Sequence, residues 1–316
     1  MAAPRFPGGL NVCGMPITGG SLLTTGDIFF VHSSGSNGNT GTDSNSPKDT
    51  IAHALACCSS STGDIVIVMP GHAETLSSTM TIDEIGVSII GLGNGMNRPL
   101  ITTATTGSDD AIDITVADVK IHNIAIQGTN STGTNVRFIN LATGADRAEI
   151  SHCVFLQQDT NLDPVTIAGG ADDIYIHDCK WYAAAAGADT GISIEASVNR
   201  PHLENLMFFY TGSAGADEGC IRFEAGGSLD VLVENARAVG LVDGQPFIYA
   251  SDATTGPTGL LLNCVCDHDD YSDIWDVTPA TGLSYINCYG AEPGSMGGSH
   301  VGAGSASVHP AVTPTL

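Results

Sequence analysis

The segment Val119-Lys-Ile-His-Asn123 returns along the chain in six related forms: Glu149-Ile-Ser-His152, Ile174-Tyr-Ile-His-Asp178, His202-Leu-Glu-Asn205, Val231-Leu-Val-Glu-Asn235, Leu260-Leu-Leu-Asn263 and Ser284-Tyr-Ile-Asn287. Each form places an apolar residue or a tyrosine two positions before a polar residue. Successive polar residues are 29, 26, 27, 30, 28 and 24 positions apart. A repeat near this length is typical of a solenoid, in which each unit forms one coil and packs only against its neighbours.

The hydrophobic pattern changes phase at the polar residue of each unit. In the third unit, for example, Ile176 lies two positions before Asp178, whereas Cys179 and Trp181 lie one and three positions after it. Because side chains alternate between the two faces of a strand, such a shift indicates a corner between two strands. The pattern therefore predicts a corner column of stacked polar residues: Asn123, His152, Asp178, Asn205, Asn235, Asn263 and Asn287.

Each unit also has an earlier short apolar strand, such as Ile112-Asp-Ile114 or Ile192-Ser-Ile194. Short strands joined by sharp corners predict an all-β chain folded as a single parallel β-helix. Side chains of the corner column would then bond to neighbouring coils, and we expect Asn205 and Asn235 to be buried. A β-sandwich or propeller is the alternative, and it predicts hairpin turns every 8 to 12 residues.

The chain divides into four expected regions. Residues 1–30 form an N-terminal arm, 31–63 a loop and a capping helix, 64–290 the β-helix, and 291–316 a Gly/Ser/Pro-rich tail. The helix is expected within 46–58, with Ser46 as its N-cap and Pro47 at its first position. It would cover the open end of the solenoid.

Charge and composition exclude several classes of partner. The 316 residues carry 10 Lys+Arg against 34 Asp+Glu, a formal net charge of −24, so nucleic acid and anionic membranes are not expected partners. No apolar run is long enough to cross a membrane, and the N-terminus lacks the pattern of a signal peptide. Nine cysteines without a metal-binding spacing are expected to be buried, reduced thiols in a protein assembled in a cytoplasm.

Two segments add a resemblance to a known family. Met69-Pro-Gly-His-Ala-Glu-Thr75 and Gly91-Leu-Gly-Asn-Gly-Met-Asn-Arg-Pro99 resemble the opening coils of right-handed parallel β-helix (pectin-lyase-like) virion-associated proteins of tailed bacteriophages. The resemblance implies a structural virion protein, foremost a capsid decoration or cement protein acting as an oligomer. It implies a homotrimer in contact with other virion proteins such as the major capsid protein. A tailspike or fibre that binds a host surface glycan is the alternative.

Catalytic motifs are not evident in the sequence. Adjacent acids such as Asp109-Asp110 and Asp172-Asp173 are unremarkable among so many carboxylates, and neither a Gly-His-Gly nor an Arg-x-Lys segment occurs. The expectation is therefore that the chain is not an enzyme and has no cofactor, with a polysaccharide lyase or glycoside hydrolase as the second alternative function. One acidic segment is expected to be a solvated loop, with a cation site as the weaker alternative: Asp267, Asp269, Asp270 and Asp273.

Two outward columns flank the apolar residue of each unit. Both begin with polar or charged residues and become apolar in the later coils, which predicts a contiguous apolar patch of Leu232, Leu260, Leu262 and Ile286. A patch of this kind is rarely left bare on a protein surface. We expect another subunit to cover it, and the alternative is that the tail 291–316 folds back over it.

Overall fold

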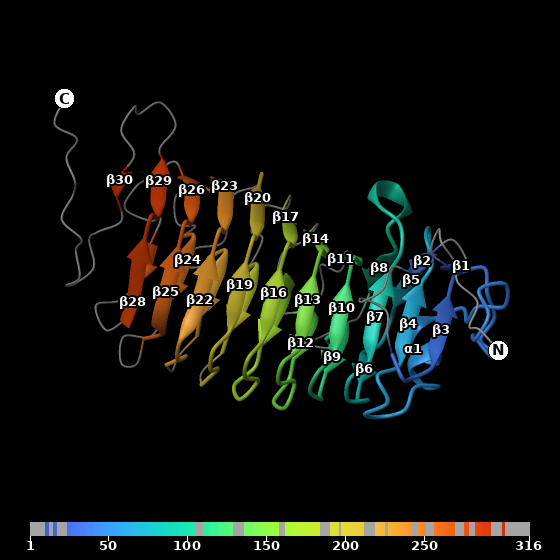
Figure 1. Cartoon of the computed structure of the whole chain (residues 1–316). Coiled ribbons are helices and arrows are strands. Elements are labelled where there is room, and N and C mark those ends of the chain that lie inside the picture. Colours follow the sequence, from blue (N-terminus) through green and yellow to red (C-terminus); the bar gives the residue numbers. More distant parts are fainter. Residues whose placement is uncertain are drawn as a thin grey trace.

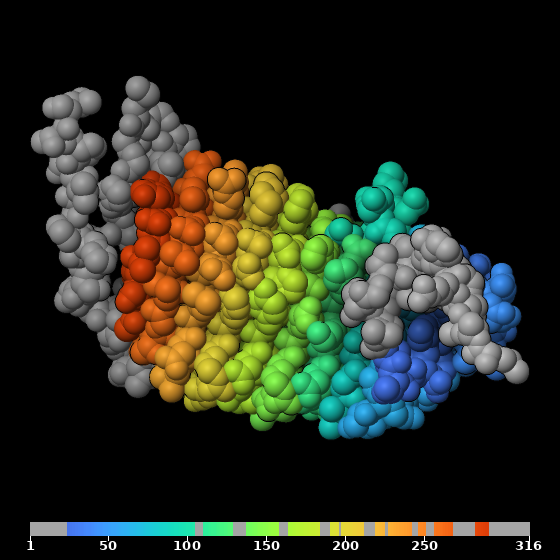
Figure 2. All heavy atoms as spheres, viewed as in Figure 1, coloured from blue at the N-terminus to red at the C-terminus, as the bar shows by residue number. Residues whose placement is uncertain are grey.

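A computed structural model shows an all-β chain wound as a right-handed parallel β-helix, as the sequence predicts (Figure 1). The structure describes residues 10–12, 15–17, 24–104, 110–128, 136–157, 162–183, 190–195, 197–211, 219–224, 227–241, 246–250, 256–268, 275–277, 282–291 and 299–300. The coils follow one another along the long axis of the molecule, so that sequence position maps onto successive bands of its surface (Figure 2).

Three sheets form the walls of the helix, and their strands are parallel except for β30. The front sheet contains β3 (Ile28–Val31), β4 (Ile65–Val68), β7 (Ser88–Gly91), β10 (Lys120–His122), β13 (Glu149–Ser151), β16 (Tyr175–His177), β19 (His202–Glu204), β22 (Val231–Glu234), β25 (Thr258–Leu262) and β28 (Gly282–Ile286). The second sheet follows each corner and contains β5 (Ala73–Leu76), β8 (Leu100–Thr103), β11 (Ala125–Gly128), β14 (Val154–Gln157), β17 (Lys180–Ala183), β20 (Met207–Tyr210), β23 (Arg237–Leu241), β26 (Val265–His268), β29 (Tyr289–Ala291) and β30 (Ser299–His300). The third sheet contains β6 (Met80–Ile82), β9 (Ile112–Ile114), β12 (Val136–Leu141), β15 (Leu162–Ile167), β18 (Ile192–Ile194), β21 (Ile221–Phe223), β24 (Ile248–Ala250) and β27 (Trp275–Val277).

The register of the front sheet follows the repeat of the sequence. Ile150 pairs with Ile176 and Ile176 with Leu203, so the apolar residues two positions before the corner stack into one buried column. Apolar surface removed from water in this way supplies the main driving force for stacking the coils.

Aromatic rings stack through the interior on the second sheet. Phe155, Trp181 and Phe208 occupy paired positions on three successive strands and are almost fully buried. Their ring centroids lie 4.9 Å and 4.6 Å apart with interplanar angles of 21° and 22°. This column fills the core between the sheets with stacked aromatic side chains.

The N-terminal coil differs in two ways from the expected boundaries. Helix α1 (Ile51–Leu55) is capped by Thr50, whose hydroxyl oxygen accepts a hydrogen bond from the amide of His53, so Ser46 is not the N-cap. Pro47 lies outside the helix, where its carbonyl accepts a hydrogen bond from the Asn39 side chain. In addition, β3 already belongs to the front sheet, upstream of residue 64.

Short elements complete the described part of the chain. β1 (Leu10–Val12) and β2 (Met15–Ile17) form an antiparallel pair, and a 3-10 turn spans Gly95–Asn97. β30 pairs antiparallel with β29 at the C-terminal end of the second sheet. Among the described residues, no helix has the length and apolar character needed to cross a membrane.

Candidate functional site

The outward face of the front sheet carries a polar band between two apolar regions. We define the polar band by the polar side chains at outward positions of β10, β13, β16, β19 and β22: Lys120, His122, Glu149, Ser151, Tyr175, His177, His202, Glu204 and Glu234. On the N-terminal side the same face is apolar, with Phe30, Ile65 and Ile67 in one cluster. Since parallel pairing stacks equivalent positions, side chains from residues about 27 apart become neighbours.

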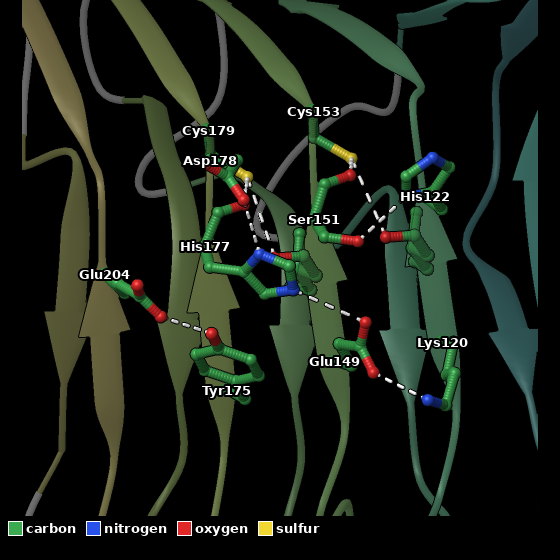
Figure 3. A network of polar contacts seen from close by, with 12 residues as sticks. Lys120, His122, Glu149, Ser151, Cys153, Tyr175, His177, Asp178, Cys179 and Glu204 are labelled. Carbon is green, nitrogen blue, oxygen red and sulfur yellow. Dashed lines mark hydrogen bonds and ion pairs between the residues drawn. The ribbon is translucent and has the colours of Figure 1, made fainter.

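A chain of polar contacts runs across the first coils of the band (Figure 3). The Lys120 ammonium lies 2.6 Å from Glu149 Oε2, and Glu149 Oε1 lies 3.4 Å from His177 Nε2. His177 Nδ1 is 2.8 Å from Asp178 Oδ2. Partial burial alone would raise the pKa of Glu149, but the Lys120 and His177 partners outweigh it and lower that pKa.

Tyr175 connects this chain to the next coil. Its ring stacks between His177 and His202, at centroid distances of 4.2 Å and 4.8 Å, and its hydroxyl donates a hydrogen bond to Glu204 Oε2 (Figure 3). The bond to Glu204, together with burial and nearby carboxylates, raises the pKa of Tyr175 well above its usual value. Tyr175 is therefore a fixed hydrogen-bond donor at neutral pH.

Two glutamates face each other at the end of the band. Glu204 and Glu234 are register partners on β19 and β22, and one oxygen of each lies within 4.8 Å of the other and of a His202 ring nitrogen. His202 Nε2 is 2.8 Å from Glu234 Oε1. Glu204 Oε1 accepts a hydrogen bond of 3.3 Å from the Asn205 amide. All three titratable side chains are partly exposed, so a ligand in solution can reach them.

The corner column lies where the sequence places it, at the junction of the first two sheets, but its side chains do not lie in the interior. Asn205 and Asn235 are exposed, contrary to the expected burial. The reason is the backbone: all seven members have φ between 52° and 57°, which turns the side chain outward. Among residues other than glycine, Asn, Asp and His tolerate this left-handed conformation best, and this explains the composition of the column.

Hydrogen bonds along the corner column are nevertheless present. The Asn205 amide donates to Asp178 Oδ1 at 3.3 Å, and the amide of Asn263 donates to Asn235 Oδ1 at 3.3 Å. Asn287 donates to Asn263 Oδ1 at 3.2 Å, and Asn123 donates to the carbonyls of Gly91 and Gly93. These hydrogen bonds lie at the surface and accompany the left-handed conformation of the corner residues.

The other candidate residues are placed as follows. Asp267 lies on β26, while Asp269, Asp270 and Asp273 lie outside the described residues. The four residues of the apolar patch are neighbours on the front sheet, since Leu232 pairs with Leu260 and Leu262 with Ile286. Ile286 is 42% exposed and the three leucines are partly exposed. Residues 292–298 and 301–316 of the tail lie outside the described residues, so the covering of the patch stays a prediction.

Sequence reasoning missed the Glu204–Glu234 pair because it looked for acids adjacent in sequence. The signal was available, since both residues stand one position before the corner in consecutive units. It also missed a second left-handed column before the front sheet, in which acidic and basic residues alternate: Asp118, Arg147, Asp173, Arg200 and Asp230. Arg147 and Arg200 each make two hydrogen bonds to the aspartate of the preceding coil, and these bonds lower the pKa of Asp118 and of Asp173.

Comparison with solved structures supports the fold. A pectin methylesterase in complex with a hexasaccharide matches with 15% identity and a TM-score of 0.58, over 83% of this chain and 89% of that chain. A rhamnogalacturonan lyase matches with 13% identity and a TM-score of 0.53, over 77% of this chain and 74% of that chain. The pectin methylesterase of Aspergillus niger matches with 16% identity and a TM-score of 0.51, over 89% of this chain and 91% of that chain. No protein-family model matches the chain, and no curated protein matches its sequence.

These neighbours overturn the expectation that the chain is not an enzyme. That expectation took missing sequence motifs as evidence against catalysis, whereas the proteins that share this fold include a lyase and methylesterases, which act on polysaccharides. At identities of 13–16% the likeness shows the fold alone. Any chemistry of this chain has to be argued from its own side chains.

Proposed function

We propose that the chain acts on a polysaccharide and cleaves a glycosidic bond at Glu204 and Glu234. The observation that carries this proposal is the carboxylate pair, with oxygens within 4.8 Å of each other on neighbouring strands of an exposed face. Glycoside hydrolysis is performed by two such carboxyl groups, and a separation of about 5–5.5 Å is typical of enzymes that retain the anomeric configuration.

The surroundings suggest a role for each glutamate. Both oxygens of Glu204 accept hydrogen bonds, from the Tyr175 hydroxyl and the Asn205 amide, and these bonds orient the carboxylate as the nucleophile. Glu234, the second carboxyl group of the pair, has its Oε1 2.8 Å from His202 Nε2 and is left for the proton transfer. Glu234 is thus assigned as general acid and base.

The reaction then proceeds in two steps. An oxygen of Glu204 bonds to the anomeric carbon as the glycosidic bond breaks, and the proton of Glu234 passes to the departing oxygen. Water next attacks the same carbon, releases Glu204 and returns a proton to Glu234. The two steps balance with the glycan and one water molecule as the only reactants.

The charge distribution favours a neutral glycan as substrate. A chain with a net charge of −24 repels polyuronates, and Lys120, the one permanent cation of the polar band, is already paired with Glu149. The band instead offers a row of hydroxyl, imidazole and carboxylate groups at the spacing of the strands. Such groups can hydrogen-bond the hydroxyls of successive sugars.

Release of reducing ends from a panel of neutral polysaccharides, including bacterial surface glycans, tests this proposal. Glu234→Gln is expected to lower the rate about 10²–10⁴-fold, because general acid–base catalysis contributes that much, and Glu204→Gln is expected to abolish turnover. Glu224→Gln, directly after β21 of the third sheet, is the matched control and should keep the wild-type rate. A wild-type chain that cleaves none of the glycans, or cleavage insensitive to both substitutions, would contradict the proposal.

A second proposal, carried by the apolar patch, concerns assembly. We propose that Leu232, Leu260, Leu262 and Ile286 contact another copy of the chain, and that the oligomer is a component of a tailed-phage particle. A trimeric decoration protein bound to the major capsid protein, or a tailspike, fits this proposal, with assembly in the host cytoplasm. The sequence resemblance at residues 69–99 and the in-register patch support it.

Mass measurement in solution tests the assembly proposal. The wild type should be oligomeric, and Leu260→Glu combined with Leu262→Glu should give monomers of unchanged fold. A monomeric wild type, or an oligomer unaffected by both changes, would refute the subunit contact. Electron microscopy of purified particles would then locate the chain on the virion.

A further inference from the structure

A second cluster of titratable side chains lies one coil away from the glutamate pair and has no part in the proposed hydrolysis. It consists of His152, His177 and Asp178, which offer one ligand atom each, all within 4.8 Å of one another. We propose that these three residues bind a divalent transition-metal ion. This inference does not rest on the proposed function.

The donor set determines the class of ion. Two imidazole nitrogens and one carboxylate oxygen suit Zn²⁺, Co²⁺ or Ni²⁺, whereas Ca²⁺ and Mg²⁺ require mostly oxygen ligands. Three protein ligands on a surface leave a further position open to water, as in metal sites that exchange a ligand. His152 is exposed, and the side chains of His177 and Asp178 are 16% and 38% exposed, so an ion can enter from solution.

The fold holds two of the three ligands at a distance that an ion can bridge. His177 Nδ1 lies 2.8 Å from Asp178 Oδ2, a hydrogen-bond distance, and two ligand atoms around one tetrahedral metal lie only about 0.5 Å further apart. His152 and Asp178 stand at consecutive corners with φ of 56° and 55°, so both side chains leave the backbone in the same outward direction. The three ligands thus converge from two adjacent coils.

Outer contacts orient the ligands as they do in established metal sites. The ring nitrogen of His177 that does not face Asp178 lies 3.4 Å from Glu149 Oε1, and Glu149 is itself held by Lys120 at 2.6 Å. The remaining oxygen of Asp178 accepts a hydrogen bond from the Asn205 amide at 3.3 Å. A carboxylate behind a metal-bound histidine fixes the ring and increases its affinity for the ion.

The glutamate pair is the natural competitor for the same ion. His202, Glu204 and Glu234 also place their ligand atoms within 4.8 Å of one another. Only one imidazole is available there, however, and the other two ligands are carboxylates. The cluster with two histidines is therefore the stronger site for a transition metal.

Titration with Co²⁺, followed by its visible absorption and by calorimetry, tests this site. The chain should carry no added histidines. Cys57 should be replaced by Ser, since it is exposed and thiolates bind the same ions, and Cys13 should be replaced as well, since it lies outside the described residues. The wild type is expected to bind one ion per chain in the micromolar range or tighter. An excess of Ca²⁺ should not displace it.

The variants are chosen to keep the corner backbone intact. His152→Asn and Asp178→Asn introduce the residue found at neighbouring corners, and each is expected, like His177→Gln, to weaken Co²⁺ binding more than about 100-fold. Glu149→Gln, which does not touch the ion, is expected to weaken it about 10-fold. His202→Gln is the matched control and should bind Co²⁺ as tightly as the wild type, and all variants should melt normally without metal.

Three results would overturn the proposal: binding no tighter than millimolar, displacement by Ca²⁺, or affinity that falls in His202→Gln and is unchanged in the three cluster variants. The last result would show that the ion binds at the glutamate pair instead.

Discussion

Replacement of Asn263 tests why polar residues occupy the corners of the β-helix. Asn263 has φ of 55° and is exposed; its amide donates to Asn235 at 3.3 Å and its oxygen accepts from Asn287 at 3.2 Å. Its backbone amide donates to the Ile286 carbonyl at 2.9 Å, so the corner backbone is held by the next coil whatever the side chain is.

The expected free-energy changes follow from these contacts. Asn263→Ala keeps a Cβ in the left-handed conformation, which costs about 1–2 kcal/mol, and loses two exposed hydrogen bonds worth about 0.5 kcal/mol each. Asn263→Gly loses the same hydrogen bonds without the strain. Glycine also gives the unfolded chain more conformational freedom, which lowers the stability of the folded state by about 0.5–1 kcal/mol. Asn263→Val should be the least stable of the three, because a β-branched residue is strongly disfavoured at positive φ.

Urea unfolding followed by tryptophan fluorescence measures this order, with unchanged slopes as the condition for comparing free energies. Stability should fall in the order wild type, Gly, Ala, Val, and Asn263→Asp should stay close to the wild type. Equal losses for Ala and Gly would refute the backbone argument and show that the side-chain hydrogen bonds alone select asparagine.

Three further predictions concern the core and the N-terminal coil. Trp181→Ala should destabilise the chain by about 3–5 kcal/mol in urea unfolding followed by circular dichroism, because it opens a cavity between Phe155 and Phe208, whereas a loss below about 1 kcal/mol would mean that this column is loosely packed. Burial would raise the pKa of Asp64, but hydrogen bonds from the amides of Ser59 and Asp27 and from the Thr62 hydroxyl outweigh burial and lower that pKa. The stability that the Asp64 carboxylate contributes is therefore present above its unfolded pKa, near 4, and is lost as pH falls through its folded pKa. Asp64→Asn should thus cost about 1–3 kcal/mol at pH 7, with a difference from the wild type that shrinks in acid melts, and a pH-independent difference would contradict this origin. Gly91→Ala should destabilise by about 1–3 kcal/mol, because the new Cβ would lie 2.3 Å from the Asn123 carbonyl oxygen; a neutral change in melting temperature would show that the coils can move apart there.

The sheet register could be predicted from the sequence because burial on the inner face enforces it. Ile150, Ile176 and Leu203 stand at the same position of their units, and a slip by one residue would turn all three outward. The extent of α1 could not be predicted as well. Ser46-Pro47 is a favourable start of a helix, but the Pro47 carbonyl is engaged by the preceding loop, and the helix begins after Thr50.

The candidate site was only partly visible in the sequence. Polar residues of one outward column were recognised, yet the meaning of Glu204 and Glu234 depends on a distance between side chains of two coils, which composition cannot supply. Likewise, the polarity of the corners was attributed to buried hydrogen bonds, because the sign of φ at Asn205 and Asn235 is not a property of the sequence pattern.

Proton NMR of the sugar first released from a cleaved neutral glycan tests the assignment of Glu204 and Glu234 most directly. The carboxylate oxygens lie within 4.8 Å of each other, which leaves no room for a water molecule to attack from the opposite face. The released sugar should therefore have the anomeric configuration of the substrate and mutarotate only afterwards. Release of the inverted anomer, or the absence of any cleavage by the wild-type chain, would contradict the assignment.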